Sequence, residues 1–219
     1  MGILSKPSGE VWLYILSAFF LSFIFNNFRP EVASGIFILL LASFMTFLYD
    51  YMFLNKISIP FSRTDKNWGK TIVIAMLSAV GFIVLTSVIN GITFQSAIAI
   101  FQSTLPVFKD SAILTGLTWM VVIPFVESSA VVRVFEAIAD LLKLKNINLK
   151  NPLVWVIIVT LGLASALFHA TAYGVDNNSA LISAFLFFSL GLAISIKMKE
   201  SKVFIIQHIF INGIALAVI

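Results

Sequence analysis

The stretch FIIQHIFINGIA, residues 204–215, is almost wholly apolar, yet it carries His208 and Asn212 four residues apart. Residues with that spacing lie on one face of a helix. The stretch therefore predicts an apolar helix with two polar side chains side by side. Burying polar groups without partners is unfavourable, so other helices of the same bundle are expected to supply their neighbours.

The composition places this helix in a membrane protein. Of the 219 residues, 60% are hydrophobic and 11% are charged, whereas soluble domains carry about 25% charged residues. The chain has no cysteine, which excludes disulfides and thiolate chemistry. We attribute the net charge of +4 to membrane topology. The expected partner is therefore the lipid bilayer, and no nucleic-acid partner is expected.

The hydropathy pattern predicts an all-α, polytopic helical bundle formed by one domain, residues 1–219. A spanning helix needs about 20 mostly apolar residues. Seven segments qualify as candidates: 11–27, 32–54, 71–92, 112–139, 152–173, 180–196 and 203–219. The intervening segment 94–109 is apolar but is interrupted by Gln95, Gln102 and Pro106. It favours an interfacial amphipathic helix or a re-entrant segment over an eighth span.

Basic residues predict a cytoplasmic N-terminus for this multi-pass protein. With that orientation, eleven of the fourteen basic residues lie in cytoplasmic segments, as the positive-inside rule requires. These eleven are Lys6, Lys56, Arg63, Lys66, Lys70, Lys143, Lys145, Lys150, Lys197, Lys199 and Lys202. The outer loops hold only Arg29 and Lys109, and Arg133 lies near the inner end of the fourth span.

Ionisable groups at membrane depth are candidates for a functional site. Glu127 lies in the fourth predicted span, and the chain's two histidines, His169 and His208, lie in the fifth and seventh. Purely structural roles are also open. Glu127 and Arg133 could form a neutralising ion pair, a buried histidine often bonds a backbone carbonyl, and Asn212 could join two helices. Ser128 and Ser129 could serve close packing.

The combination of these groups favours chemistry. A carboxylate beside an imidazole can activate water as a general base. A second histidine and an asparagine amide can stabilise the oxyanion of a tetrahedral intermediate. Glu127, His169, His208 and Asn212 together would suit hydrolysis of a peptide bond inside the membrane. Alternatively, Glu127, His169 and His208 could bind zinc and leave an open position for water.

The C-terminal half, residues 112–219, resembles the CAAX prenyl protease and bacteriocin-processing family of intramembrane glutamic endopeptidases. That family has the motifs EExxxR after a proline, FxxxH on the next helix and HxxxN on the last helix of its core. The counterparts here are PFVESSAVVR (124–133), SALFHATAYG (165–174) and HIFIN (208–212). Their order, helix placement and separation agree with the family pattern.

The resemblance implies a role for each matching residue. Glu127 and His169 would activate the attacking water, and His208 with Asn212 would hold the oxyanion. Arg133 and Ser128 would be supporting residues, and no metal or other cofactor is implied. The expected substrate is a membrane-associated peptide or protein, such as a lipidated C-terminus or a leader peptide.

The first motif departs from the family pattern in two places. Ser128 replaces the second glutamate, and Arg133 follows Glu127 by six residues instead of five. Six residues turn a regular helix by about 240°, so Arg133 would face elsewhere unless a π-bulge realigns it. Ser165 also replaces the phenylalanine of FxxxH. These departures keep open an inactive relative that acts as a scaffold or immunity factor, and intramembrane Glu and His also allow a proton-coupled transporter.

His169 and His208 can share a site only if they lie at the same depth in the membrane. At about 1.5 Å per residue, His169 lies about 25 Å from the cytoplasmic start of its span, whereas His208 lies less than about 10 Å from its own. Straight, perpendicular helices would keep these side chains apart. We therefore expect strong tilt, a broken fifth helix, or a turn at 197–202 that dips into the bundle.

Overall fold

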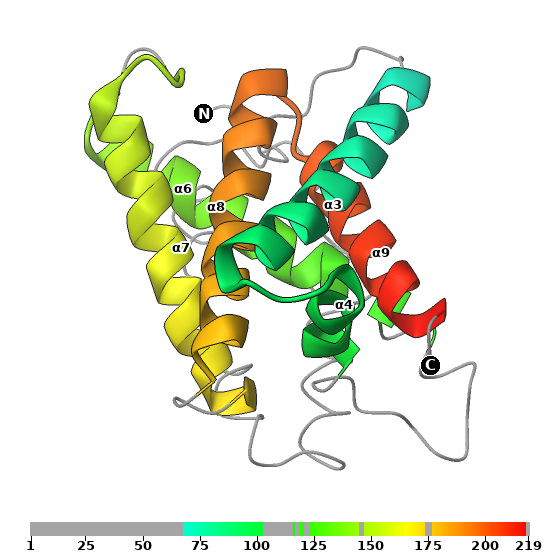
Figure 1. Cartoon of the computed structure of the whole chain (residues 1–219). Helices are drawn as coiled ribbons and strands as arrows, with labels where there is room; N and C mark the ends of the chain where they lie inside the picture. Colours follow the sequence, from blue (N-terminus) through cyan, green and yellow to red (C-terminus); the bar gives the residue numbers. More distant parts are fainter. Residues whose placement is uncertain are drawn as a thin grey trace.

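The computed structural model describes residues 68–102, 116, 119–120, 123–144, 147–173 and 177–217. These residues form helices and connecting turns, with no strand among them, so the predicted all-α class is confirmed for this part of the chain. The helices are α3 (Trp68–Asn90), α4 (Phe94–Gln102), α6 (Ile123–Leu141), α7 (Pro152–Tyr173), α8 (Asn178–Met198) and α9 (Lys202–Ala217) (Figure 1).

Four predicted spans coincide with helices of the structure. The segments 71–92, 152–173, 180–196 and 203–219 correspond to α3, α7, α8 and α9, apart from a few residues at their ends. Among the described residues, α3 and α8 are long and apolar enough to cross a membrane. The predicted spans 11–27 and 32–54, and the segment 103–109, lie outside the described residues. Within the predicted span 112–139, helix α6 begins at Ile123.

Local sequence signals explain where these helices begin. Asn151 accepts a hydrogen bond from the backbone N–H of Leu153, and Pro152 occupies the first position of α7. Asparagine is a favoured N-cap, and proline suits the first helical position because its missing N–H is not needed there. Asn177 caps α8 in the same way by accepting from the N–H of Ala180.

A separate short helix follows α3, as the polar interruptions of 94–109 predict. Gly91 has φ +61°, a left-handed conformation that glycine adopts readily. The chain then restarts at α4, where the Thr93 hydroxyl accepts a hydrogen bond from the N–H of Ser96. Ala97 and Ile98 of α4 are buried, whereas Phe94 is exposed. This helix therefore packs one face against the bundle.

The turn between α8 and α9 carries the chain into the bundle. Lys199 adopts a left-handed conformation with φ 54°, and Glu200 donates its N–H to the carbonyl of Ser195. The turn is tied to α3 because the Thr71 hydroxyl donates to the Glu200 carboxylate at 2.9 Å. Figure 1 shows α9 starting below the end of α8. Val203 is fully buried although it is the second residue of α9, so this turn is the inward dip that a shared site requires.

Aromatic side chains fill the centre of the bundle. Phe187 of α8 lies between Phe82 of α3 and Phe204 of α9, with ring centroids 5.5 and 5.2 Å away. Phe188 completes the group at 6.0 Å from Phe204. Edge-on aromatic contacts of this kind add to the gain from burying the rings. The cluster fixes α8 against α9 at mid-length, where His208 also lies.

Close packing at Gly191 gives the first prediction. A Cβ at this position of α8 would fall on the Phe204 ring. That ring is fully buried and flanked by Phe187 and Phe188, so it has little room to move. Gly191→Ala should lower the free energy of unfolding by about 1–3 kcal/mol, the usual cost of overpacking, as measured by denaturant titration in detergent micelles.

Gly81→Ala is the matched control for this substitution. Gly81 lies in the middle of α3, and a Cβ there would meet open space. Alanine is favoured over glycine inside a helix by about 0.5–1 kcal/mol, so this variant should be slightly more stable than the parent. Equal stability of the two variants would contradict the packing of α8 against α9.

Candidate functional site

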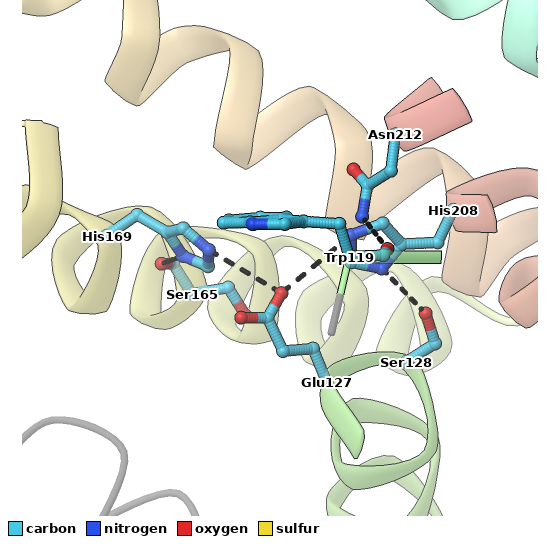
Figure 2. A network of polar contacts seen from close by, with 7 residues as sticks. All are labelled: Trp119, Glu127, Ser128, Ser165, His169, His208 and Asn212. Carbon is cyan, nitrogen blue, oxygen red and sulfur yellow. Dashed lines mark hydrogen bonds and ion pairs between the residues drawn. The ribbon is translucent and has the colours of Figure 1, made fainter. Parts of the chain in front are cut away.

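Glu127 lies at the centre of the candidate site. It belongs to the second turn of α6, which begins at Ile123 with Pro124 in its first turn. Its Oε2 atom is 3.7 Å from Nε2 of His169 and 3.9 Å from Nε2 of His208 (Figure 2). The three groups predicted on separate helices therefore converge on one point, as a shared site requires.

His169 is oriented by its own helix. Its Nδ1 lies 2.7 Å from the backbone carbonyl of Ser165, one turn earlier on α7. A carbonyl oxygen can only accept, so Nδ1 carries a hydrogen and donates it. The ring packs against Phe188 with centroids 5.2 Å apart. Nε2 is thereby directed at Glu127, as Figure 2 shows.

This arrangement controls the protons shared by Glu127 and His169. With Nδ1 protonated, a neutral His169 presents a lone pair at Nε2, and an ionised Glu127 also presents lone pairs. His169 Nε2 and Glu127 Oε2 are then two acceptor atoms 3.7 Å apart. Their lone pairs repel each other unless a proton or a hydrogen-bond donor lies between them. One water molecule can donate to both. The pair is therefore suited to bind a water molecule and to accept a proton from it.

His208 faces the same carboxylate from α9. Its Nε2 approaches Glu127, while its Nδ1 lies 3.2 Å from the hydroxyl of Ser128. The ring packs edge-on against Phe187, with centroids 4.6 Å apart. Ser128 is fully buried. The serine that replaces the second glutamate of the family motif thus bonds the histidine of HxxxN.

Asn212 lies one turn beyond His208 on the same face of α9. Its Nδ2 donates to the backbone carbonyl of Trp119 at 2.7 Å, which fixes the orientation of the amide. A primary amide has two N–H groups, so one hydrogen bond to Trp119 leaves a second donor. Figure 2 shows the amide beside the His208 ring, with the Trp119 indole extending toward His169.

The site has an open side and a closed side. The side chains of Glu127 and His169 keep 16% and 15% of their surface exposed, whereas His208 keeps 8%. Asn212 is 5% exposed. The Glu127–His169 pair is therefore the more accessible part of the site, while the donors of His208 and Asn212 line its inner wall.

Arg133 and Glu127 lie on different faces of α6. Residues 123–141 form an α-helix, so Arg133 follows Glu127 by about 240° around its axis. The π-helical residues that the structure describes, Trp119 and Met120, precede Glu127. They do not provide the realignment that would place Arg133 on the face of Glu127. The side chain of Arg133 lies outside the described part of the structure.

Five contacts of the site were not predicted. The Trp119 carbonyl and the Phe187 and Phe188 rings carry no motif that marks them, because their contacts depend on how the helices pack. The Ser165 carbonyl has a signal in hindsight, since it lies four residues before His169 and a helix brings it beneath the ring. The contact between Ser128 and His208 joins two residues that are 80 positions apart.

Removing the Ser128 hydroxyl should alter His208. Ser128→Ala deletes the partner of His208 Nδ1, and a net hydrogen bond contributes about 0.5–1.5 kcal/mol to stability. We expect a loss of this size and a changed ¹⁵N shift of the His208 ring by NMR. Ser78→Ala is the control, because the Ser78 hydroxyl donates within its own helix to the Ala75 carbonyl. Unchanged His208 shifts would contradict the contact.

Zinc remains the alternative for the same three side chains. Tetrahedral zinc with bonds of about 2.0–2.1 Å holds its ligand atoms about 3.3–3.4 Å apart. The two distances from Glu127 are 3.7 and 3.9 Å, so a few tenths of an ångström of contraction would be needed. No group of three His, Asp or Glu residues within the described ranges is already arranged to hold a metal ion.

The chain was compared with known proteins on three levels. No protein-family model, no curated protein and no solved structure matches it.

Proposed function

We propose that the protein is an intramembrane endopeptidase of the glutamic type, related to the CAAX prenyl protease and bacteriocin-processing family. The observation that carries this proposal is that His169 and His208 both lie within 4 Å of the Glu127 carboxylate, inside an apolar helical bundle. The substrate would be a membrane-associated peptide or protein, such as a lipidated C-terminus or a leader peptide.

A multi-pass placement with a cytoplasmic N-terminus is part of the proposal. α3, α7 and α9 begin, and α6 and α8 end, at one end of the bundle (Figure 1). Exposed Lys143, Lys150, Lys197 and Lys199 lie at that end, as expected of a cytoplasmic face. Trp68 and Trp155 are exposed there too, and tryptophan favours the membrane interface.

The apolar surface supports the same placement. α3 exposes nine large hydrophobic side chains, and α7 exposes six. Lipid is the natural neighbour of such surfaces, because water would make their exposure unfavourable. Buried positions of α3 include Ala75 and Ala79, small residues of the kind that let membrane helices approach closely.

The reaction follows from the positions of the four side chains. A water molecule bound to Glu127 and His169 gives up a proton to this pair as its oxygen attacks the carbonyl carbon of the substrate. The carbonyl oxygen becomes an oxyanion, which accepts hydrogen bonds from His208 Nε2–H and the second N–H of Asn212. His169 then donates a proton to the leaving nitrogen as the C–N bond breaks.

Ser128 fits this scheme through the tautomer of His208. A hydroxyl that donates to Nδ1 leaves the hydrogen of the neutral ring on Nε2, the nitrogen that faces Glu127. Nε2–H is the donor that the oxyanion needs. The substitution of serine for the second glutamate is therefore compatible with activity.

Cleavage of a membrane-peptide library by the purified protein tests the proposal. The protein is compared with Glu127→Ala and His208→Ala, and we expect cleavage by the parent alone. Equal cleavage by all three proteins would defeat the mechanism. Loss of cleavage on chelation and its recovery with zinc would replace it by the metal mechanism.

Two further outcomes identify the rival functions. Liposome flux that depends on Glu127, without any cleavage, would indicate a proton-coupled transporter. Binding of peptides without cleavage or flux would indicate an inactive relative that acts as a scaffold or immunity factor.

A further inference from the structure

Gln207 is a buried polar residue that the proposed reaction does not use. It lies on α9 directly before His208 and is fully buried. Neither its amide oxygen nor its amide nitrogen has a hydrogen-bond partner among the described residues. Its neighbour His208, by contrast, bonds Ser128, and Asn212 bonds the Trp119 carbonyl. Buried amides are nearly always satisfied, by protein groups or by ordered water.

The level of Gln207 in the bundle can be read from the contacts of α9 with α3. The Lys202 ammonium lies 4.7 Å from the centroid of the Trp68 ring, and Glu200 bonds Thr71. These contacts join the start of α9 to the start of α3. Gln207 follows Lys202 by five residues on α9, so it lies less than two helical turns from this junction.

α3, which packs against α9, has small buried side chains. Ala75 and Ala79 lie one turn apart on α3, and both are fully buried. Small residues let helices approach closely. A buried amide in such an interior supplies the hydrogen-bond partners that an internal water molecule needs.

Two more buried hydroxyls lie between Gln207 and the lysine-rich end. Ser195 is buried in the last turn of α8, and Ser201 immediately precedes α9. Both hydroxyl oxygens lack a hydrogen-bond partner within the described part of the chain. The N–H of Glu200 donates to the carbonyl of Ser195, which keeps this pair at the level of the turn. Buried polar atoms thus extend from the α8–α9 turn toward His208.

We propose that Gln207 binds internal water within the helical bundle, and that this water supplies the reaction beside His208. The amide offers two donors and one acceptor, which complement a water molecule. Water that enters at Ser195 and Ser201 would pass Gln207 and reach the Glu127–His169 pair from inside the bundle. The water site stands on burial alone, whereas its supply role rests on the proposed peptidase function.

Radiolytic hydroxyl labelling in H₂¹⁸O tests the water site without any substrate. Side chains next to bound water take up ¹⁸O even when they are inaccessible to bulk solvent. The full-length protein in detergent should incorporate ¹⁸O at Phe204 and His208. Gln207→Met, which keeps the length of the side chain and removes the amide, should lose this label. Phe82, fully buried on α3, serves as the internal reference and should stay unlabelled.

The outcomes separate the water site from the peptidase function. Absence of label at Phe204 and His208 in the parent protein overturns the site, and this result needs no variant to fold. Equal label in the parent and in a folded Gln207→Met also overturns it. Gln207→Leu provides a second apolar replacement, and circular dichroism verifies the fold of each variant.

Kinetics then test the supply role. Gln207→Met should lower kcat for peptide cleavage and leave KM unchanged, because water delivery affects the chemical step and not peptide binding. Loss of label with unchanged kcat would overturn the supply role and support the water site. A parent protein that carries the label but cleaves nothing would overturn the supply role together with the peptidase function, while the water site would stand.

Discussion

Glu127→Gln should lower the rate of peptide cleavage by about 10²–10⁴-fold, the range that general-base catalysis contributes. Glutamine has nearly the same shape and can still accept a hydrogen bond from water, but it cannot take up a proton. His169 would remain bound to the Ser165 carbonyl without the carboxylate that stabilises its protonated form. The rate is measured as kcat on the best peptide from the library.

Glu200→Gln provides the control for this substitution. Glu200 lies in the α8–α9 turn, and its carboxylate accepts a hydrogen bond from Thr71, which an amide oxygen can also do. We expect unchanged cleavage and an unchanged fold. A Glu127→Gln protein that cleaves as fast as the Glu200→Gln protein would remove the carboxylate from the mechanism.

Helices α7 and α8 could be predicted because local capping signals agree with the hydropathy pattern there. The start of α7 is marked by Asn151 and Pro152 as well as by the onset of an apolar run, and Asn177 marks the start of α8 in the same way. The face shared by His208 and Asn212 follows from their spacing alone. Such local signals do not depend on the rest of the fold.

The depth of the helices could not be predicted from the same signals. Hydropathy gives the length of an apolar segment, but it does not give the level at which the segment begins. The structure buries Ser201 and Val203 at the start of α9, and this placement brings His208 to Glu127. The sequence allowed strong tilt, a broken fifth helix or an inward turn at 197–202, and the burial of these two residues supports the inward turn.

The backbone acceptors and the packing partners of the site could not be predicted from the sequence either. The Trp119 carbonyl that orients Asn212 is a group that every residue has, so no sequence pattern marks it. The aromatic rings against His169 and His208 come from Phe188 and Phe187, adjacent members of a chain with 22 phenylalanines. Only the three-dimensional packing selects them.

Asn212→Leu should lower kcat by about 10²–10³-fold, the usual effect of losing one oxyanion donor. Leucine has a similar volume but cannot donate a hydrogen bond. It also removes the hydrogen bond from Asn212 to the Trp119 carbonyl, which should reduce stability by about 0.5–1.5 kcal/mol. The unfolding free energy is measured beside kcat, so that loss of fold and loss of catalysis are separated.

A double-mutant cycle with His208→Phe decides whether the two residues serve one oxyanion. Phenylalanine preserves the edge-on packing against Phe187 and removes both ring nitrogens. Two donors that act on the same atom are coupled, so the double variant should lose less activity than the product of the single losses. Losses that multiply in full would instead assign His208 and Asn212 to separate steps, and Asn212 would then act by holding α9 to Trp119.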